Sequence, residues 1–351
     1  MVEPQSTHEL LRTVGPESLD LRSPPRVAGV GAGIAGLSLA SLLAEHRFRV
    51  RVFDAGGTPG GRIATHRRSG FRFDHGAQYA TVRDAEFYQL LEELAAAGAA
   101  AHWHGRVRVL EAGQVSDTPG EDPARYVGVP GMSAWAERLA RPLQVTCGVR
   151  VAAVVRERDH WRLLAADRLL GIFDLVVLAV PAPQALPLLT AAPALAAQVQ
   201  TVRMRPTWTL MTAFGQPLDL PFDGAFVHGS EVLSWAARDN SKEGRPGAEC
   251  WVLHARHGWS ETHLEDEPAA VGQALLAAFS AAAGRALPEP TLVLPHRWRY
   301  AVPERPLSEP FLTALSGRLG LCGDWCGGPR IEGAFLSGRA LARHLLDRFN
   351  P

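Results

Sequence analysis

The chain has 351 residues, and its 36 basic and 36 acidic residues give a formal net charge of zero. Such a chain has no general attraction for nucleic acid or acidic membranes, and we expect neither as a partner. No apolar run reaches the roughly 20 residues that a membrane-spanning helix requires, and the N-terminus lacks the apolar core of a secretory signal. We therefore expect a cytoplasmic protein of about two domains.

Residues 1–25 are polar and contain prolines, which predicts a loose N-terminal extension before the fold begins. An apolar strand over residues 27–30 then runs directly into a G-x-G-x-x-G turn over residues 31–36. A helix with an apolar period follows the turn, and a second strand, over residues 49–53, ends on Asp54. A strand, a glycine turn, a helix and a strand with a terminal acid, in this order, predict a dinucleotide-binding unit.

The glycines of this turn have separate physical roles. Gly31 permits the tight turn, Gly33 lets the backbone approach a pyrophosphate, and Gly36 lets the helix and the strand pack closely. The helix N-terminus offers free N–H groups to the phosphates, and Asp54 is placed to accept hydrogen bonds from ribose hydroxyls. The residues expected to bind the dinucleotide here are Gly31, Gly33, Ile34, Ala35, Gly36 and Asp54.

The remaining chain alternates between helices and strands. The continuous apolar run over residues 173–180 is typical of a parallel strand buried on both faces. Because nucleotide-binding elements stand at both ends and in the middle of the chain, the segments between them are expected to form a second domain. The other expected strands lie near residues 71–73, 106–115, 145–164, 203–214, 225–237, 249–254 and 315–322, and the helices near 84–97, 134–140, 184–199, 267–283 and 333–349.

The segment after Asp54 distinguishes between dinucleotides. Asp54-Ala55, followed by Gly60-Gly61-Arg62, resembles the extended fingerprint of FAD enzymes in the flavin amine oxidase-like superfamily. Gly323-Asp324 and the segment 331–338 resemble the closing FAD motif of the same superfamily. The resemblance implies an FAD cofactor, which we expect to be non-covalent because no Cys or His stands in a flavin-linking motif. It adds these expected cofactor contacts: Ala55, Gly61, Arg62, Gly76, Ala77, Gln78, Val151, Gly323, Asp324, Gly333 and Ala334.

The resemblance also implies a fold class. We expect an α/β protein in which a Rossmann-like FAD-binding domain carries an inserted α+β substrate domain that covers the flavin. The FAD-binding domain is expected over residues 26–83, 141–183 and 296–351. The substrate domain is expected over residues 84–140 and 184–295.

Short motifs in the middle of the chain resemble the renalase-like branch of the superfamily. They cover residues 74–79, 126–133, 235–245, 251–254 and 298–301. This resemblance implies a small-molecule substrate that transfers a hydride to the flavin, which O2 then reoxidises to give H2O2. In that branch the implied substrates are the 2- and 6-dihydro isomers of NAD(P). Two alternatives stay open: an FAD-dependent amine oxidase or carbon–carbon desaturase, and a non-catalytic flavin-binding protein.

One departure from the amine oxidases is visible in the sequence. Those enzymes commonly place a lysine near the reactive position of the flavin, on a strand shortly before the closing motif. The matching segment here, residues 292–300, contains no lysine, and Lys242 is the only lysine of the chain. The usual amine oxidase site is therefore in question, whereas hydride transfer to a flavin needs no such residue.

Candidate substrate residues follow from the same motifs. Trp298 and Tyr300 share a face of one strand, where they either line a slot for a planar ring or pack in the core. Gln78 and Trp235 are further candidates for positioning the ring. We expect no metal site, because the chain shows no set of ligands at metal-binding spacing.

A basic cluster follows the strand near Trp235. It either holds the phosphates of a dinucleotide substrate by charge-assisted hydrogen bonds or forms a solvated turn. The expected substrate-binding residues are Arg238, Asn240, Lys242, Arg245 and His254.

Overall fold

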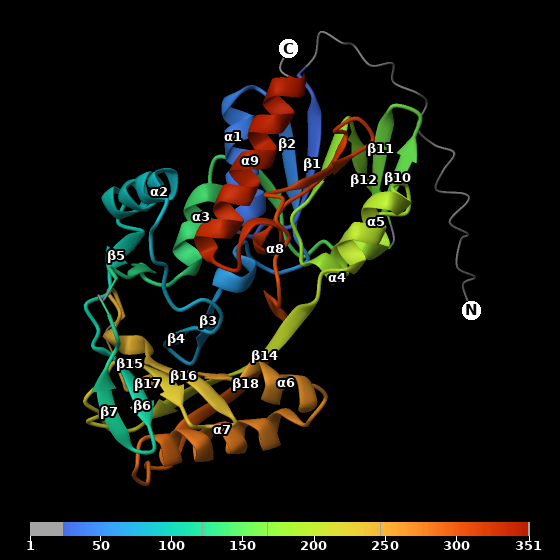
Figure 1. Ribbon diagram of the computed structural model, residues 1–351. Coiled ribbons are helices and arrows are strands. Elements are labelled where there is room, and N and C mark those ends of the chain that lie inside the picture. Colours follow the sequence, from blue (N-terminus) through green and yellow to red (C-terminus); the bar gives the residue numbers. More distant parts are fainter. Residues whose placement is uncertain (1–23, 121–122, 167, 246, 350–351) are drawn as a thin grey trace.

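The computed structural model describes residues 24–120, 123–166, 168–245 and 247–349 (Figure 1). Of the expected N-terminal extension, residues 1–23 lie outside this described part. No helix within the described part is long and apolar enough to cross a membrane.

The upper part of the molecule in Figure 1 is a six-stranded, mostly parallel sheet. In spatial order its strands are β19 (Leu312–Ala314), β20 (Leu319–Leu321), β13 (Leu175–Leu178), β1 (Arg26–Val30), β2 (Arg49–Phe53) and β9 (Gln144–Thr146). Alternate side chains of β13 enter two different cores, Val177 on one face and Val176 on the other. This burial on both faces explains the continuous apolar run of the sequence.

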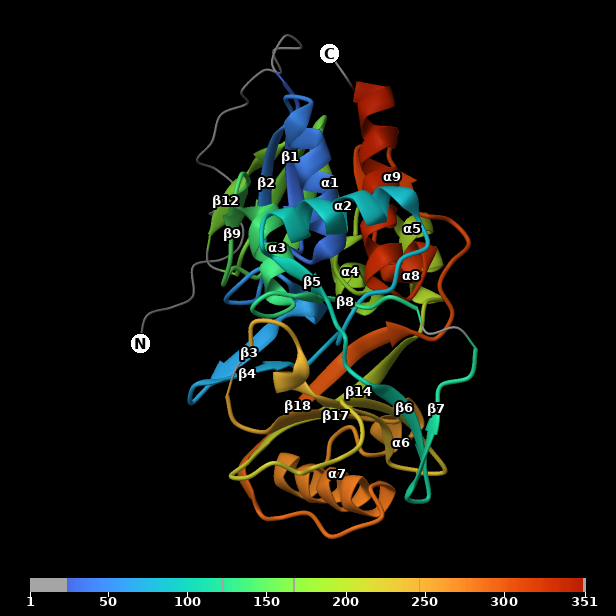
Figure 2. The same cartoon turned by 90° about the vertical axis from the view of Figure 1, so that its left-hand side faces the viewer.

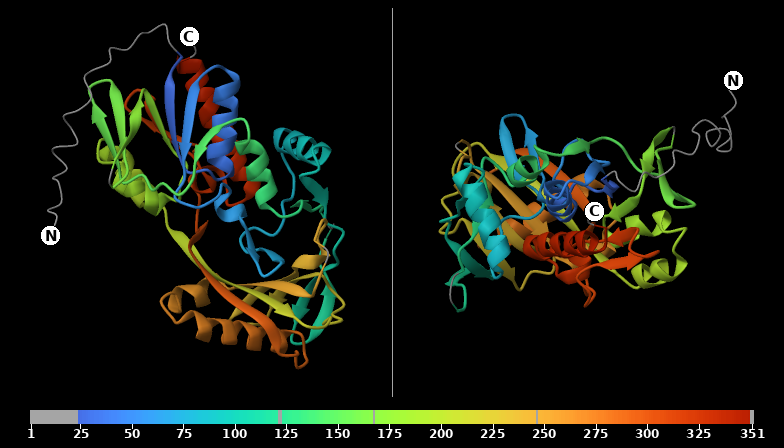
Figure 3. Two further views of the ribbon diagram at one scale, coloured as in Figure 1. Left: turned by 180° about the vertical axis from the view of Figure 1, so that it is seen from behind. Right: turned by 90° about the horizontal axis from the view of Figure 1, so that it is seen from above.

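Different elements pack on the two faces of the parallel sheet. Helices α1 (Ile34–Glu45) and α9 (Ile331–Phe349) lie side by side on the first face. The second face packs against a three-stranded sheet and two short helices, and Figure 3 shows both sets of elements. The elements on the second face are β10 (Ala153–Glu157), β11 (His160–Leu164), β12 (Leu169–Phe173), α4 (Ala182–Ala185) and α5 (Pro193–Gln200).

The lower part of the molecule is built on a seven-stranded sheet. In spatial order its strands are β18 (Pro290–Pro303), β14 (Met204–Phe214), β17 (Cys250–Ala255), β16 (Leu233–Arg238), β15 (Gly224–His228), β6 (Val107–Glu111) and β7 (Gln114–Asp117). Helix α7 (Pro268–Ala282) packs on the face turned away from the parallel sheet, and Phe279 is fully buried there against Trp251. The other face of this sheet is therefore turned towards the nucleotide-binding elements.

The remaining elements are smaller. They are β3 (Thr65–Arg68), β4 (Phe71–Asp74), α2 (Ala85–Ala96), β5 (Ala100–His102), β8 (Tyr126–Gly128), α3 (Ser133–Ala140), α6 (His257–Thr262) and α8 (Asp324–Gly327), with 3-10 turns η1 (Gly61–Ile63), η2 (Leu186–Leu188) and η3 (Asp239–Ser241). Figure 2 shows α2 and α3 beside α1 and α9. Phe87 of α2 and Trp135 of α3 are buried in the core beneath α1. The structure thus places both helices with the parallel sheet, although we expected residues 84–140 in the substrate domain.

Two expected elements are divided in the structure. The helix expected over residues 184–199 is interrupted between α4 and α5, where Pro187 and Pro193 remove backbone donors. These helices also pack with the parallel sheet rather than with the seven-stranded one. The strand expected over residues 225–237 is the hairpin of β15 and β16. The α/β fold with a Rossmann-like domain is confirmed.

Candidate active site

One cavity of about 1560 Å³ is lined by residues of both sheets. Its volume exceeds the roughly 300–1,000 Å³ of a pocket for one drug-sized ligand, so it has room for a dinucleotide and a small substrate. The turn after β1, the first turn of α1 and the start of α9 line one side. Strands β14, β16, β17 and β18 line the other side.

The glycine turn after β1 borders this cavity. Gly31 has a φ of +105°, a backbone conformation that L side chains rarely adopt, and a Cβ there would lie 2.5 Å from the carbonyl oxygen of Ala179. A side chain on Gly36 would collide with the carbonyl of Gly31. A Cβ on Gly33, in contrast, would meet no atom within 4 Å. Gly33 thus leaves open the space through which an anion can reach the backbone.

The N-terminus of α1 faces the same space. Gly33 is its N-cap and provides no side-chain cap, and Ile34 and Ala35 of the first turn border the cavity. The unpaired N–H groups of a helix start bind phosphates. The carboxylate of Asp54 fixes the glycine turn, because it accepts hydrogen bonds from the N–H groups of Ala32 (2.6 Å) and Gly56 (2.7 Å). These features fit the pyrophosphate and ribose of FAD.

Arg62 and Asp324 meet at the cavity although 262 residues separate them. The guanidinium donates two hydrogen bonds to the carboxylate, at 2.6 and 2.7 Å, and a third to the carbonyl of Ala301. Paired hydrogen bonds of this kind fix both position and orientation. The pair therefore joins the segment after β2 to the closing motif in one wall.

All but two of the residues expected to contact the cofactor border the cavity. Gly36 and Gly333 do not border it. Each of these two glycines lies close to another backbone segment, Gly36 to the carbonyl of Gly31 and Gly333 to that of Gly328. Glu332, which the sequence did not single out, also borders the cavity. Those of the expected set that border it are Gly31, Gly33, Ile34, Ala35, Asp54, Ala55, Gly61, Arg62, Gly76, Ala77, Gln78, Val151, Gly323, Asp324 and Ala334.

A row of side chains from five neighbouring strands forms the floor of the cavity on the seven-stranded sheet. His296 pairs with Thr209, Thr209 with His254, His254 with Trp235, and Trp235 with Phe226. Directly paired residues of adjacent strands point to the same face of a sheet, and all five border the cavity. We call these five residues the floor row. Sequence reasoning selected Trp235 and His254 from it, and missed the other three as site residues.

The other expected ring-positioning residues also border the cavity, and Trp298 lies next to His296 of the floor row, with ring centroids 4.5 Å apart. The indole of Trp298 stacks on the ring of His75 with centroids 4.9 Å apart, and its N–H donates a hydrogen bond of 2.9 Å to the His75 carbonyl. The side-chain amide of Gln78 donates to the carbonyls of Asp74 and Gly76. Tyr300 borders the cavity as well. Hydrogen bonds thus fix Trp298 and Gln78 at the cavity wall.

Three histidines at the cavity are held in the neutral form. Burial, with repulsion from His296, His66 and His254, lowers the pKa of His75 from 6.5 to about 3. Burial likewise lowers the pKa of His254 and of His296 to about 4. Above about pH 5 these three rings therefore carry no positive charge.

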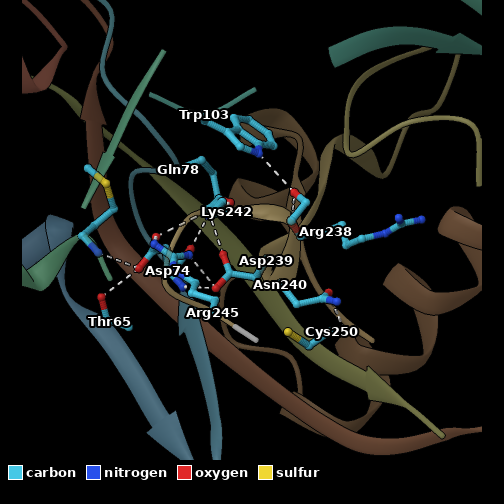
Figure 4. A network of polar contacts seen from close by, with 12 residues as sticks. Thr65, Asp74, Gln78, Trp103, Arg238, Asp239, Asn240, Lys242, Arg245 and Cys250 are labelled. Atoms are coloured by element: carbon cyan, nitrogen blue, oxygen red, sulfur yellow. Dashed lines mark hydrogen bonds and ion pairs between the residues drawn. The ribbon is translucent and has the colours of Figure 1, made fainter. Parts of the chain in front are cut away.

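Lys242 and Arg245, which we expected to bind the substrate, are not among the residues that line the cavity. Both lie against the carboxylates of Asp74 and Asp239 (Figure 4). The Lys242 Nζ lies 2.7 Å from the carboxylate of Asp239 and 3.4 Å from that of Asp74. Arg245 contacts the same two carboxylates, at 2.8 and 2.5 Å. Burial alone would raise the pKa of Asp239, but the two cations lower it below its usual value. The expected phosphate-binding role is corrected accordingly: this quartet is a buried ionic network, with both cations already paired.

Arg238, the third member of the expected basic cluster, and Asn240 also lie outside the cavity lining. Arg238 pairs with Asp223 and Glu249, each at 3.3 Å. Asn240 accepts a hydrogen bond of 3.1 Å from a backbone N–H of β17. Of the residues expected to bind the substrate, only His254 borders the cavity.

Comparisons with known proteins place these features in context. The family model for an NAD(P)-binding Rossmann-like domain matches residues 30–94, and the model for flavin containing amine oxidoreductases matches residues 100–346, more than half of the chain. Renalase from Mus musculus is 24% identical over 297 residues, which cover 79% of this chain and 84% of renalase.

Solved structures show the same fold. A variant of putrescine oxidase superposes with a TM-score of 0.71 at 15% identity, covering 93% of this chain and 99% of that one. An oxidoreductase from Methanosarcina mazei superposes with a TM-score of 0.69 at 16% identity, covering 91% of this chain and 100% of that one.

Proposed function

The chain belongs to the flavin containing amine oxidoreductase family, and from this premise we propose that it is a renalase-like oxidase of reduced nicotinamide isomers. In this proposal FAD is bound without a covalent link, and the substrate is a 2- or 6-dihydro isomer of NAD(P). When bound, FAD would supply the hydride acceptor, and O2 would then take up the two electrons as H2O2.

The neutral character of the floor row is the observation that carries this proposal. A simple amine is an ammonium ion near neutral pH and must lose a proton before a hydride can leave. Imidazoles with a pKa of about 4, such as His254 and His296, are poor bases for that step. A dihydronicotinamide ring becomes aromatic by loss of a hydride alone, so the residues around it need only hold it in place. Strand β18 offers His296 and Trp298 to the cavity, and no lysine.

Anaerobic mixing of the holoprotein with candidate substrates tests this function. We expect a 2- or 6-dihydro isomer of NAD to bleach the flavin at an ordinary turnover rate, about 1–1,000 per second, and to do so faster than NADH. Putrescine and simple monoamines are expected to bleach it far more slowly, because His254 and His296 of the floor row are poor bases. Rapid bleaching by an amine would establish an amine oxidase instead. If no reduced substrate bleaches the flavin, the non-catalytic alternative is favoured.

The pH dependence of flavin reduction is a separate prediction. The pKa of His75 is about 3 and those of His254 and His296 are about 4, all below the usual 6.5. The three rings therefore stay neutral from high pH down to about pH 5 and gain protons only below it. We expect the rate constant for flavin reduction by the dihydro isomer to be nearly flat between about pH 5 and pH 8. Stopped-flow rates that inflect near pH 6.5 would contradict this, since they would require a histidine with an ordinary pKa in the reaction.

A further inference from the structure

Three adjacent residues of the floor row carry buried polar atoms without a partner. They are the hydroxyl Oγ1 of Thr209, Nε2 of His254 and the indole Nε1 of Trp235. None has a hydrogen-bond partner among the described residues. Buried polar atoms are almost always paired in folded proteins, and unpaired ones cost free energy. Three in succession across adjacent strands, all bordering one cavity, indicate a place where a ligand completes the hydrogen bonds.

The donor and acceptor pattern of these atoms restricts the ligand. The indole N–H of Trp235 is a donor only, whereas the Thr209 hydroxyl can donate or accept. The backbone of His75 acts on the His254 ring in the sense that favours a proton on it, and we assign the proton of the neutral ring to the nitrogen other than the unpartnered Nε2. Nε2 of the neutral ring is then an acceptor. The ligand group must offer a donor to His254 and an acceptor to its neighbours.

Charge restricts the ligand further. No member of the floor row is ionised, and the cation near His254, Lys242, is fully buried and bound to Asp74 and Asp239. A carboxylate placed here would lose its hydration without a free cation to replace it. It would also present no donor to Nε2 of His254. A neutral primary amide meets both requirements, with its NH2 as donor and its carbonyl as acceptor.

The spacing of the row suits a group of this size. Cβ atoms of directly paired residues on adjacent strands lie about 5 Å apart. Hydrogen bonds of about 2.9 Å can therefore reach one amide group from two neighbouring strands. Its NH2 and carbonyl ends can engage different members of the row.

We propose that Thr209, His254 and Trp235 recognise a primary carboxamide on the substrate ring and select it over the corresponding carboxylic acid. This proposal rests on the proposed function, because dihydronicotinamides carry such a carboxamide. Trp298 and His75, stacked beside the row, would border the ring itself. The three residues are specificity-determining, since they act on a group that does not react.

Titration of the holoprotein with dead-end ligands tests the proposal without turnover. Nicotinamide and nicotinate are added separately, and the change in the flavin absorption spectrum gives each Kd. We expect nicotinamide to bind at least about tenfold more tightly than nicotinate. The Thr209→Val and Trp235→Phe variants should each lose most of that preference, and His254→Phe should abolish it.

Thermal stability separates this role from a structural one. Because the Thr209 hydroxyl and the Trp235 indole N–H have no partner, Thr209→Val and Trp235→Phe should leave the Tm of the ligand-free protein unchanged or raise it. Thr212→Val is the matched control on the same strand. The Thr212 hydroxyl donates a hydrogen bond of 2.9 Å to the Leu292 carbonyl, and Thr212 does not border the cavity. That variant should have a lower Tm and an unchanged amide preference.

The outcomes distinguish this proposal from the proposed function. If neither ligand binds, or if both bind alike in the wild-type protein, the carboxamide site is refuted, even where dihydro isomers reduce the flavin. If the three variants keep the wild-type preference, it is refuted as well. If the preference exists and is lost in the variants while no dihydro isomer reduces the flavin, the oxidase proposal fails and the carboxamide site stands.

Discussion

Replacing Gly33 with valine is expected to give a folded protein that purifies without flavin. The backbone at Gly33 is extended, with φ −76° and ψ 178°, which valine adopts without strain. Its Cβ would meet no protein atom within 4 Å, so the fold itself has room for the side chain. That room is the space through which the cofactor pyrophosphate would approach the first N–H groups of α1. The side chain and the cofactor therefore compete for one volume.

The expected loss of affinity is large. Steric overlap in a packed site costs about 1–3 kcal/mol, and each lost hydrogen bond to a charged group costs about 1.5–3 kcal/mol more. Together these predict at least about a hundredfold weaker binding. The measurement is the ratio of flavin to protein absorbance after purification, with Tm recorded in parallel. In the wild type, acid precipitation should release FAD into solution and leave a colourless pellet.

Two other glycines serve as controls. A side chain on Gly36 would collide with the carbonyl of Gly31, so Gly36→Val is expected to damage the fold as well as cofactor binding. Gly215 lies away from the cavity, and its Cβ would make only an ordinary contact of 3.5 Å with Thr291. Gly215→Val should therefore keep the flavin. A Gly33→Val protein with a wild-type flavin content would refute this account of the turn.

The contrast between Gly33 and the floor row shows which parts of the site can be predicted from a sequence. The glycine turn and the segment from Asp54 to Arg62 are contiguous, so their spacing alone brings most of their residues to one cavity. The floor row joins five strands, and the pairings of β14 with β17 and β18 connect segments that are far apart in the sequence. Alternation along β18 indicates that His296, Trp298 and Tyr300 share a face. It cannot indicate that Thr209 pairs with His296 and His254, because register is set by tertiary packing.

The basic cluster was misread for a related reason. One of the two carboxylates that neutralise Lys242 belongs to Asp74, 168 residues away in the sequence. The only local signal was Asp239, three residues before Lys242. A charged segment read by itself is typical of a solvated turn or an anion site. Only the folded chain shows that β4 brings the missing carboxylate to it.

Arg245→Ala is accordingly expected to lower the free energy of unfolding by about 3–5 kcal/mol, the cost of breaking a buried ion pair by removing one partner. In the native protein Asp74 and Asp239 face Lys242 and Arg245, so two negative charges meet two positive charges. Without Arg245 one buried negative charge is left without compensation. The guanidinium also donates to the carbonyls of Gly128 (3.1 Å) and Pro130 (3.1 Å), which lose their donor. Urea unfolding followed by fluorescence measures the difference.

A charge-balanced variant is the sharpest test of the buried network. Lys242→Met alone leaves the same excess negative charge and should destabilise the protein by a similar amount. Lys242→Met combined with Asp239→Asn removes one charge of each sign, so the double variant should be more stable than either single variant. Arg245 and the groups it contacts lie outside the cavity lining, so the Kd of the dihydro isomer for the Arg245→Ala holoprotein should change little. The Lys242 variants are compared for stability alone, because Lys242 Nζ also donates a hydrogen bond of 3.0 Å to Oε1 of Gln78, which borders the cavity. If Arg245→Ala keeps its stability and instead weakens substrate binding, the arginine does hold a substrate phosphate, and the buried network is not its role.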